Sequence, residues 1–153
     1  MRTLDKQLRG IRGHIRSREL PRPDRIVIGT AANTAVIEFT ADTAVDRLAR
    51  LVSWADSLTD PFGAWVLLPN GRLIIEVTGT GPAGMTVSAG IVCPLAKLGG
   101  GKTDYDENRY SLGSALLFVD KVDTVYVREL KECLSVARLA ARVVDPAGLG
   151  AAA

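Results

Sequence analysis

The chain has 153 residues, of which 47% are hydrophobic and 24% are charged. This composition suits one globular domain with a buried core and excludes a wholly disordered chain. Two cysteines are too few for a disulfide scaffold, and they show no metal-ligand spacing. Charges occur throughout the first 25 residues, and no apolar run approaches the length of about 18 residues that spans a membrane. We therefore expect a cytoplasmic protein without a signal peptide or a membrane partner.

Positive charge is concentrated near the start of the chain, although the net charge of the whole chain is only +2. Residues 1–25 carry a net charge of +5, and the remaining residues carry −3. A basic segment on a slightly acidic body predicts either an arm for nucleic acid or an acidic partner, or a solvated helix face. Both interpretations stay open. The candidates for contact with nucleic acid are Arg9, Arg12, Arg16 and Arg18.

The first predicted element is an amphipathic helix over residues 3–18, because apolar side chains recur at helical spacing among arginines. Pro21 and Pro23 end it, since the residue before each proline is pushed out of the helical region. The apolar stripe is narrow and has little local sequence to cover it, so we expect it to mediate self-association. A helix folded back on its own sheet is the competing explanation. The stripe consists of Leu4, Leu8, Ile11 and Ile15.

Two strands at 25–30 and 34–40 follow, and then a second helix at 43–57. The residues expected to cap this helix are Thr40 or Asp42. Residues 59–63 break the helix, because they combine proline and glycine.

A second hairpin is predicted from strands at 64–68 and 72–79. Asn70-Gly71 lies between them and favours a two-residue turn with positive φ at both central positions. A fifth strand at about 84–93 follows.

The last third of the chain is predicted to hold a loop, a strand and a helix. Residues 94–113 are polar and glycine-rich, which favours a long loop. Residues 114–119 are apolar without alternation, so this sixth strand is expected to be buried on both faces. Helical periodicity covers residues 125–144, and Pro146 ends the helix.

These elements predict an α+β fold with two layers: a mainly antiparallel sheet of five or six strands, and helices on one of its faces. The chain divides into a basic amphipathic helix (1–20), a single α+β domain (21–145) and a tail of small residues (146–153). A repeat of one helix and two strands, at an offset of 38 residues, is also indicated. Convergent strand patterning explains the same matches.

Several segments resemble a group of small uncharacterised proteins of high-GC actinobacteria, their plasmids and their phages. The most specific are Trp54-Ala55-Asp56-Ser57-Leu58 and the strand Leu73 to Gly79. Further matching segments are Ile11 to Ile15, Leu20 to Pro23 and Asp46-Arg47-Leu48-Ala49. The resemblance covers about residues 4–92. It implies a cellular setting, either the host cytoplasm or a phage particle, and no functional residues.

The sharpest local motif is the segment 96–103 (AKLGGGKT), which fits a permissive phosphate-loop pattern. Lys102 would contact the outer phosphates and Thr103 a magnesium ion. Such a loop should open into a helix, whereas residues 104–107 contain three acids that would repel phosphate. The same acids lack the glycine and the final glutamate spacing of a calcium loop. We expect an exposed loop that holds neither nucleotide nor metal.

Nucleophilic catalysis has little support in the sequence. His14 is the one histidine, and we expect it to be an exposed helix residue. Cys93 and Cys133 are expected to be small buried hydrophobic residues. The sequence therefore predicts no catalytic residue and no cofactor.

Glu38 and Glu76 occupy matching places in the two hairpins and are expected to project from the same sheet face. Paired carboxylates serve acid–base chemistry or metal binding when burial separates their pKa values. The opposite face holds the apolar residues, so we expect both glutamates to face solvent, where Arg72 or another base pairs with them.

Trp54 lies about 110° from the centre of the apolar arc of its helix, counting 100° per residue. This position is typical of a residue at the rim of a partner surface, and a tryptophan at the core boundary is the alternative. We take Trp54 as a partner-binding candidate together with the stripe of the first helix.

Three functions follow from these observations. The first is a non-enzymatic interaction or assembly module that forms a homo-oligomer or binds a protein partner, including a component of a phage particle. The second is a nucleic-acid-binding regulator that uses the basic N-terminal segment. The third is a nucleotide-dependent enzyme that uses residues 96–103.

Overall fold

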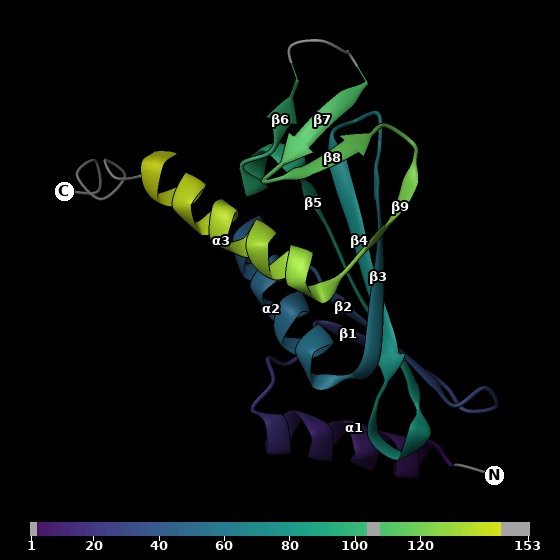
Figure 1. Ribbon diagram of the computed structural model, residues 1–153. Coiled ribbons are helices and arrows are strands. Elements are labelled where there is room, and N and C mark those ends of the chain that lie inside the picture. Colours follow the sequence, from purple (N-terminus) through teal and green to yellow (C-terminus); the bar gives the residue numbers. More distant parts are fainter. Residues whose placement is uncertain (1–2, 104–107, 145–153) are drawn as a thin grey trace.

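The computed structural model describes residues 3–103 and 108–144 (Figure 1). Within them the chain forms three α-helices, a six-stranded sheet and a three-stranded sheet, which confirms the predicted α+β class. None of these helices is long and apolar enough to cross a membrane. The tail at 146–153 lies outside the described residues. The helices are α1 (Leu4–Arg18), α2 (Ala44–Ser57) and α3 (Val127–Val144).

The larger sheet is mixed but mostly antiparallel. Across it, the strands follow the order β1 (Arg25–Gly29), β2 (Thr34–Phe39), β5 (Thr86–Pro94), β4 (Arg72–Thr80), β3 (Thr59–Leu67) and β9 (Val122–Val125). Among the described strand pairs of this sheet, β2 and β5 alone are parallel. This pair arises because α2 carries the chain from β2 across the sheet to β3, and the β3–β4–β5 meander then returns to β2.

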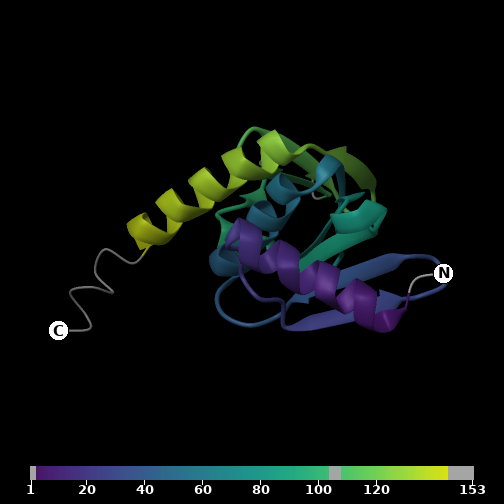
Figure 2. The same ribbon diagram turned by 90° about the horizontal axis from the view of Figure 1, so that it is seen from below.

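Helices α2 and α3 pack on one face of this sheet, which we call the inner face, and the core lies between the two layers (Figures 1 and 2). Alternation along β4 sends Leu73 and Ile75 into the core. Leu48 and Leu51 meet them from α2, because residues three and four apart share one helix face. Thr43, rather than Thr40 or Asp42, caps α2, and its hydroxyl accepts a hydrogen bond from the backbone of the residue three positions on.

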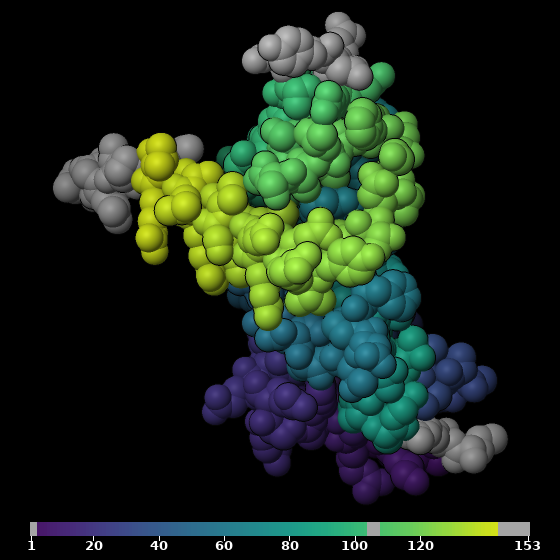
Figure 3. Space-filling view, viewed as in Figure 1, coloured from purple at the N-terminus to yellow at the C-terminus, as the bar shows by residue number. Residues whose placement is uncertain are grey.

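Helix α1 lies across one end of the molecule, and the three-stranded sheet lies at the other end (Figures 1 and 3). Gln7 and Ile11 are buried there. The side-chain amide of Gln7 donates to the carbonyl of Gly29 (3.4 Å) and to the side chain of Asn33 (3.2 Å). These contacts attach α1 to the end of the first hairpin. The same helix also contacts η1 (Pro82–Gly84), in the turn between β4 and β5.

The prediction of a long loop at 94–113 is wrong, because the described residues of this region, 94–103 and 108–113, contain regular structure. It holds a 3₁₀ turn, η2 (Leu95–Leu98), and the strands β6 (Gly101–Lys102) and β7 (Arg109–Leu112), which form the smaller sheet with β8 (Ala115–Phe118). Leucines at the two ends of this region are buried and anchor it to the core. They are Leu95, Leu98 and Leu112.

The prediction that the strand at 114–119 is buried on both faces is also wrong. In β8, Leu117 enters the core, whereas Leu116 and Phe118 are exposed. The continuous apolar run reflects a two-sided strand at the edge of the small sheet rather than a central strand.

Three further features of the chain differ from the predictions. The segment 59–63 ends α2 as expected but already belongs to β3, and the short strand β9 was not predicted. The Asn70-Gly71 turn joins β3 and β4, but of its two residues only Gly71 has a positive φ (84°). A backbone hydrogen bond from Gly71 N–H to the carbonyl of Leu68 closes the turn, as in a type I turn followed by a left-handed glycine.

The order helix–strand–strand does recur, as the repeat predicts. The two helices nevertheless have different roles, since α2 covers the inner face and α1 covers an end of the sheet. The repeat is therefore one of chain order and strand phase, and it does not extend to helix packing.

Candidate interaction surfaces

The face of the six-stranded sheet opposite α2 and α3, here called the outer face, carries no helix of the described chain (Figure 1). Of the eleven large hydrophobic side chains exposed in the described residues, five lie on this face. Strand alternation and register place them there, because their cross-strand partners also point away from the core. They are Val27, Val36, Phe62, Val92 and Val122.

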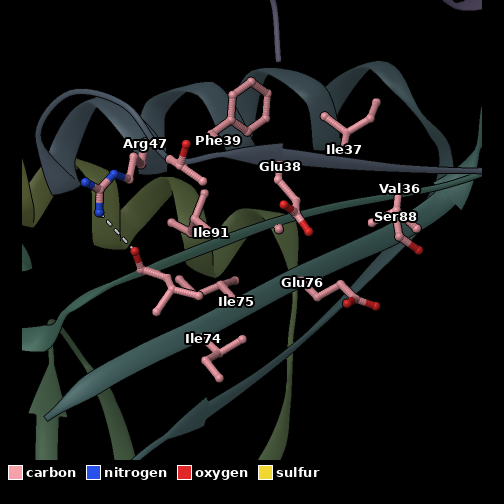
Figure 4. Close-up of a pocket in the computed structure, with 13 residues that line it drawn as sticks. Val36, Ile37, Glu38, Phe39, Arg47, Ile74, Ile75, Glu76, Ser88 and Ile91 are labelled. Atoms are coloured by element: carbon pink, nitrogen blue, oxygen red, sulfur yellow. Dashed lines mark hydrogen bonds between the residues drawn. The ribbon is translucent and has the colours of Figure 1, made fainter. Parts of the chain in front are cut away.

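A shallow hollow of about 310 Å³ lies in the outer face, around Gly90 (Figure 4). Register pairs Glu38 with Gly90, and Gly90 in turn with Glu76, so the two carboxylates flank a residue without a side chain. The expectation that both glutamates project from one sheet face is confirmed. Val36 and Ile74 supply apolar walls on either side of this row.

The two glutamates differ in their ionic surroundings. Glu38 faces Arg25 of β1 at 3.8 Å, so the pairing base is Arg25 and not Arg72. Glu76 forms no ion pair with any other described residue. The backbones of the two glutamates are two strand spacings apart, roughly 10 Å. That separation suits contact with two cationic groups or with water, and no group of three or more metal-ligating side chains occurs in the described residues.

Arg47 closes one end of the hollow (Figure 4). Its guanidinium donates to the carbonyls of Ala41 (3.4 Å), Asp42 (3.1 Å) and Val92 (3.0 Å). These bonds fasten the loop before α2 to β5. The side chain is thus committed to the fold and shapes the hollow, because three of its N–H donors are used within the protein.

The basic face of α1 is a second exposed surface. Arg9 and Arg16 lie on the side of α1 away from the buried Ile11, and Arg12 lies at the flank. These three side chains and Arg18, at the helix end, are exposed. None of these arginines forms an ion pair or a side-chain hydrogen bond within the described residues. Their charges therefore face solvent, as both sequence interpretations of this segment require.

The apolar stripe of α1 is largely covered by the chain itself. Ile11 is buried, Leu8 and Ile15 are half-buried, and Leu4 alone of the four stripe residues remains exposed. The competing explanation, a helix folded back on its own domain, accounts for Ile11 and Ile15. This stripe does not offer a continuous surface to a partner.

Trp54 is not at a rim, contrary to the prediction. Its side chain is fully buried, and its indole Nε1 donates to the carbonyl of Pro21 at 2.8 Å. Its ring also packs against His14, with the ring centres 5.8 Å apart. The angular position of Trp54 depends on α2 alone, whereas α1 and the segment that follows it cover that side of the helix.

His14 is half-buried rather than exposed, and its Nε2 lies 2.9 Å from the hydroxyl of Ser57. Ser57 donates its own proton to the carbonyl of Trp54 (2.6 Å), so its oxygen accepts from the imidazole N–H. Burial, with a smaller effect of Arg18, lowers the pKa of His14. A base that activates serine must accept the serine proton, and this arrangement is the reverse. The pair therefore ties α1 to α2.

Both cysteines are buried, as predicted. Burial raises the pKa of Cys93 to about 11 and that of Cys133 to about 11. Their thiols are protonated near neutral pH and are poor nucleophiles.

The segment 96–103 has the geometry of a turn that enters a hairpin. Gly99 adopts a left-handed conformation (φ 85°) after η2, and Lys102 pairs with Tyr110 in the small sheet. The backbone N–H of Thr103 donates to the carbonyl of Arg109 (3.0 Å), which continues the pairing between β6 and β7. Lys102 is exposed, as expected. The acids at 104–107 lie outside the described residues.

Sequence reasoning missed the outer face as a surface. The signal lies in the positions that alternate with the buried residues along each strand. Several of these outward positions hold β-branched apolar residues, such as Val36, Ile74 and Val92. Periodicity alone does not identify this face as a surface, because the same phase also contains the charged Glu38 and Glu76. Comparison of the chain with family models, with curated proteins and with solved structures found no match.

Proposed function

We propose that this protein is a non-enzymatic assembly module whose copies associate through the open six-stranded sheet. The observation that carries the proposal is the uncovered apolar side of this sheet, which holds five of the eleven exposed large hydrophobic side chains of the described residues, with Val27 and Val122 on the two edge strands. Exposed apolar groups gathered on one face are typical of interaction sites. The resemblance noted in the sequence suggests an actinobacterium or its phage as the setting.

The sheet is a better candidate for self-association than the stripe of α1. Most of that stripe is covered by the protein's own residues. The six-stranded sheet is uncovered on its outer face and ends in the open edge strands β1 and β9.

Mass in solution and amide hydrogen exchange, each at a low and a high concentration, test the proposal. We expect the mass to rise with concentration, and the added protection to fall on strands of the six-stranded sheet rather than on α1. A protein that stays monomeric up to a concentration of about 1 mM would contradict the proposal, because a dimer with a dissociation constant below that concentration would be detected. Added protection confined to α1 would contradict it too and would restore the apolar stripe as the interface.

Nucleic-acid binding through the basic face of α1 is the second candidate. The observation that favours it is that Arg9, Arg12, Arg16 and Arg18 are all exposed and without ion-pair partners in the described residues. Phosphate contacts need this kind of free, clustered positive charge. The experiment that separates this function from assembly closes the Discussion.

A further inference from the structure

The two edges of the six-stranded sheet, β1 and β9, differ in how well they are protected. An edge strand exposes backbone N–H and C=O groups, and proteins usually shield such an edge with charges. β9 has this protection: Asp123 lies opposite Trp65 on the inner side and forms an ion pair with Lys121 at 3.5 Å. The centre of β1 has no charge, since Ile26, Val27 and Ile28 occupy it.

The side chains of β1 are also incompletely covered on both faces. Ile26 and Ile28 point to the inner face but are only half-buried, and Val27 on the outer face is 44% exposed. In Figure 2 the β1–β2 hairpin runs along the lower border of the molecule, beside α1. An uncharged edge strand with three consecutive β-branched residues favours pairing with another strand.

We propose that two copies of this chain join edge to edge, with β1 of one copy antiparallel to β1 of the other and Val27 at the two-fold axis. The proposal rests on the proposed self-association and names its contact. Pairing about the middle of a five-residue strand places Arg25 opposite Gly29 of the second copy, so the two arginines stay apart. The two six-stranded sheets become continuous.

The charges of the outer face argue for this edge contact over a face-to-face dimer. Stacking two outer faces would bury Glu38 and Glu76 of both copies, and Glu76 has no ion-pair partner among the described residues. Burying an unpaired carboxylate is strongly unfavourable. Edge pairing leaves both glutamates in water and satisfies backbone groups in the middle of β1, whereas the carbonyl of Gly29 at its end already accepts a hydrogen bond from Gln7. An isologous contact of this kind also closes at two copies.

Substitution of Val27 by a charged residue tests the edge contact, and the same substitution of Val122, on the opposite edge strand, is the matched control. Val27→Lys and Val27→Asp each place like charges opposite each other, so each should raise the dissociation constant of the dimer by about fivefold or more. Mixing the two variants should restore association. Val122→Lys should leave the dissociation constant unchanged, although Val122 is more exposed (66%) than Val27. Melting temperatures near that of the wild type will show that the variants are folded.

Cysteine trapping detects the contact even if it is weak. Val27→Cys should form a disulfide-linked dimer under mild oxidation much faster than Val122→Cys, because only the former brings two copies of the same residue together. The native cysteines are buried and should not compete. Equal rates of disulfide formation in the two cysteine variants would overturn the edge contact while the assembly function stands. The same holds if Val27→Lys and Val27→Asp both associate as tightly as the wild type. A monomeric wild type with no trapping would overturn both.

Discussion

The indole N–H of Trp54 on α2 donates to the backbone carbonyl of Pro21, 33 residues earlier, at 2.8 Å. This bond ties the segment that follows α1 to the helix that covers the sheet. The ring of His14 packs on the same tryptophan, so α1 and α2 meet at one buried side chain. Trp54 is thus an anchor between the N-terminal helix and the rest of the domain.

Replacing Trp54 with phenylalanine should destabilise the fold, because the carbonyl of Pro21 loses its donor in a partly buried place. We expect a loss of about 1–3 kcal/mol in the free energy of unfolding, from the unpaired carbonyl and the smaller ring. Denaturant unfolding measures it. Trp65→Phe is the control, since Trp65 is similarly buried in β3 and no hydrogen bond of its indole N–H occurs within the described residues. Equal losses in the two variants would show that the bond to Pro21 contributes nothing.

The burial of His14 predicts a pH dependence of stability. Burial lowers the pKa of His14 from its ordinary value of 6.5, so the unfolded chain binds a proton before the folded chain does. Stability should therefore decline as pH falls below about 6.5 and level off once the folded imidazole is protonated. Thermal unfolding of His14→Gln should lack this decline, because His14 is the one histidine of the chain. A decline of the same size in that variant would assign it to another group.

The two thiols should be unreactive in the folded protein. Burial raises the pKa of each to about 11, so at pH 8 almost no thiolate is present at either site. A colorimetric thiol reagent should modify Cys93 and Cys133 slowly in buffer and rapidly in denaturant. Rapid modification of one thiol in buffer would show that its surroundings open in solution.

Local patterns were sufficient to predict the layers of this fold. Helical spacing located α2 and α3, and alternation in the first two hairpins gave the phase that sends Ile37 and Ile75 inward and Glu38 and Glu76 outward. These features depend on periodicity within one element. The parallel neighbours β2 and β5 could not be predicted in this way, because their pairing depends on where α2 crosses the sheet.

The candidate surfaces were harder to predict, because exposure depends on what the rest of the chain covers. Ile11 and Trp54 were expected to face partners, yet both are buried by segments distant in sequence. The small sheet was missed for a related reason: glycines at 99–101 suggested a loop, while Leu95 and Leu98 bury themselves against the core. The edge position of Val27 could not be predicted either, because it depends on the order of the strands in the sheet.

Nucleic-acid binding by the basic face of α1 makes the last prediction. If this face binds DNA or RNA, affinity should fall steeply with salt, because each phosphate contact releases condensed counterions. Replacing Arg9, Arg12, Arg16 and Arg18 together with glutamine should abolish the binding, since these side chains are exposed and free of ion pairs with described residues. Fluorescence anisotropy with a labelled duplex and a labelled single strand, at a series of salt concentrations, measures both effects.

The control for this experiment is Val27→Lys, which adds a positive charge on the sheet edge while the arginines of α1 stay in place. It should retain binding if the arginines are responsible. The quadruple glutamine variant should in turn keep the self-association proposed for β1, because its substitutions all lie on α1. Absence of binding by the wild type at low salt would remove the nucleic-acid function. Loss of self-association in the glutamine variant, with its fold intact, would instead move the assembly contact from the sheet edge to the basic face of α1.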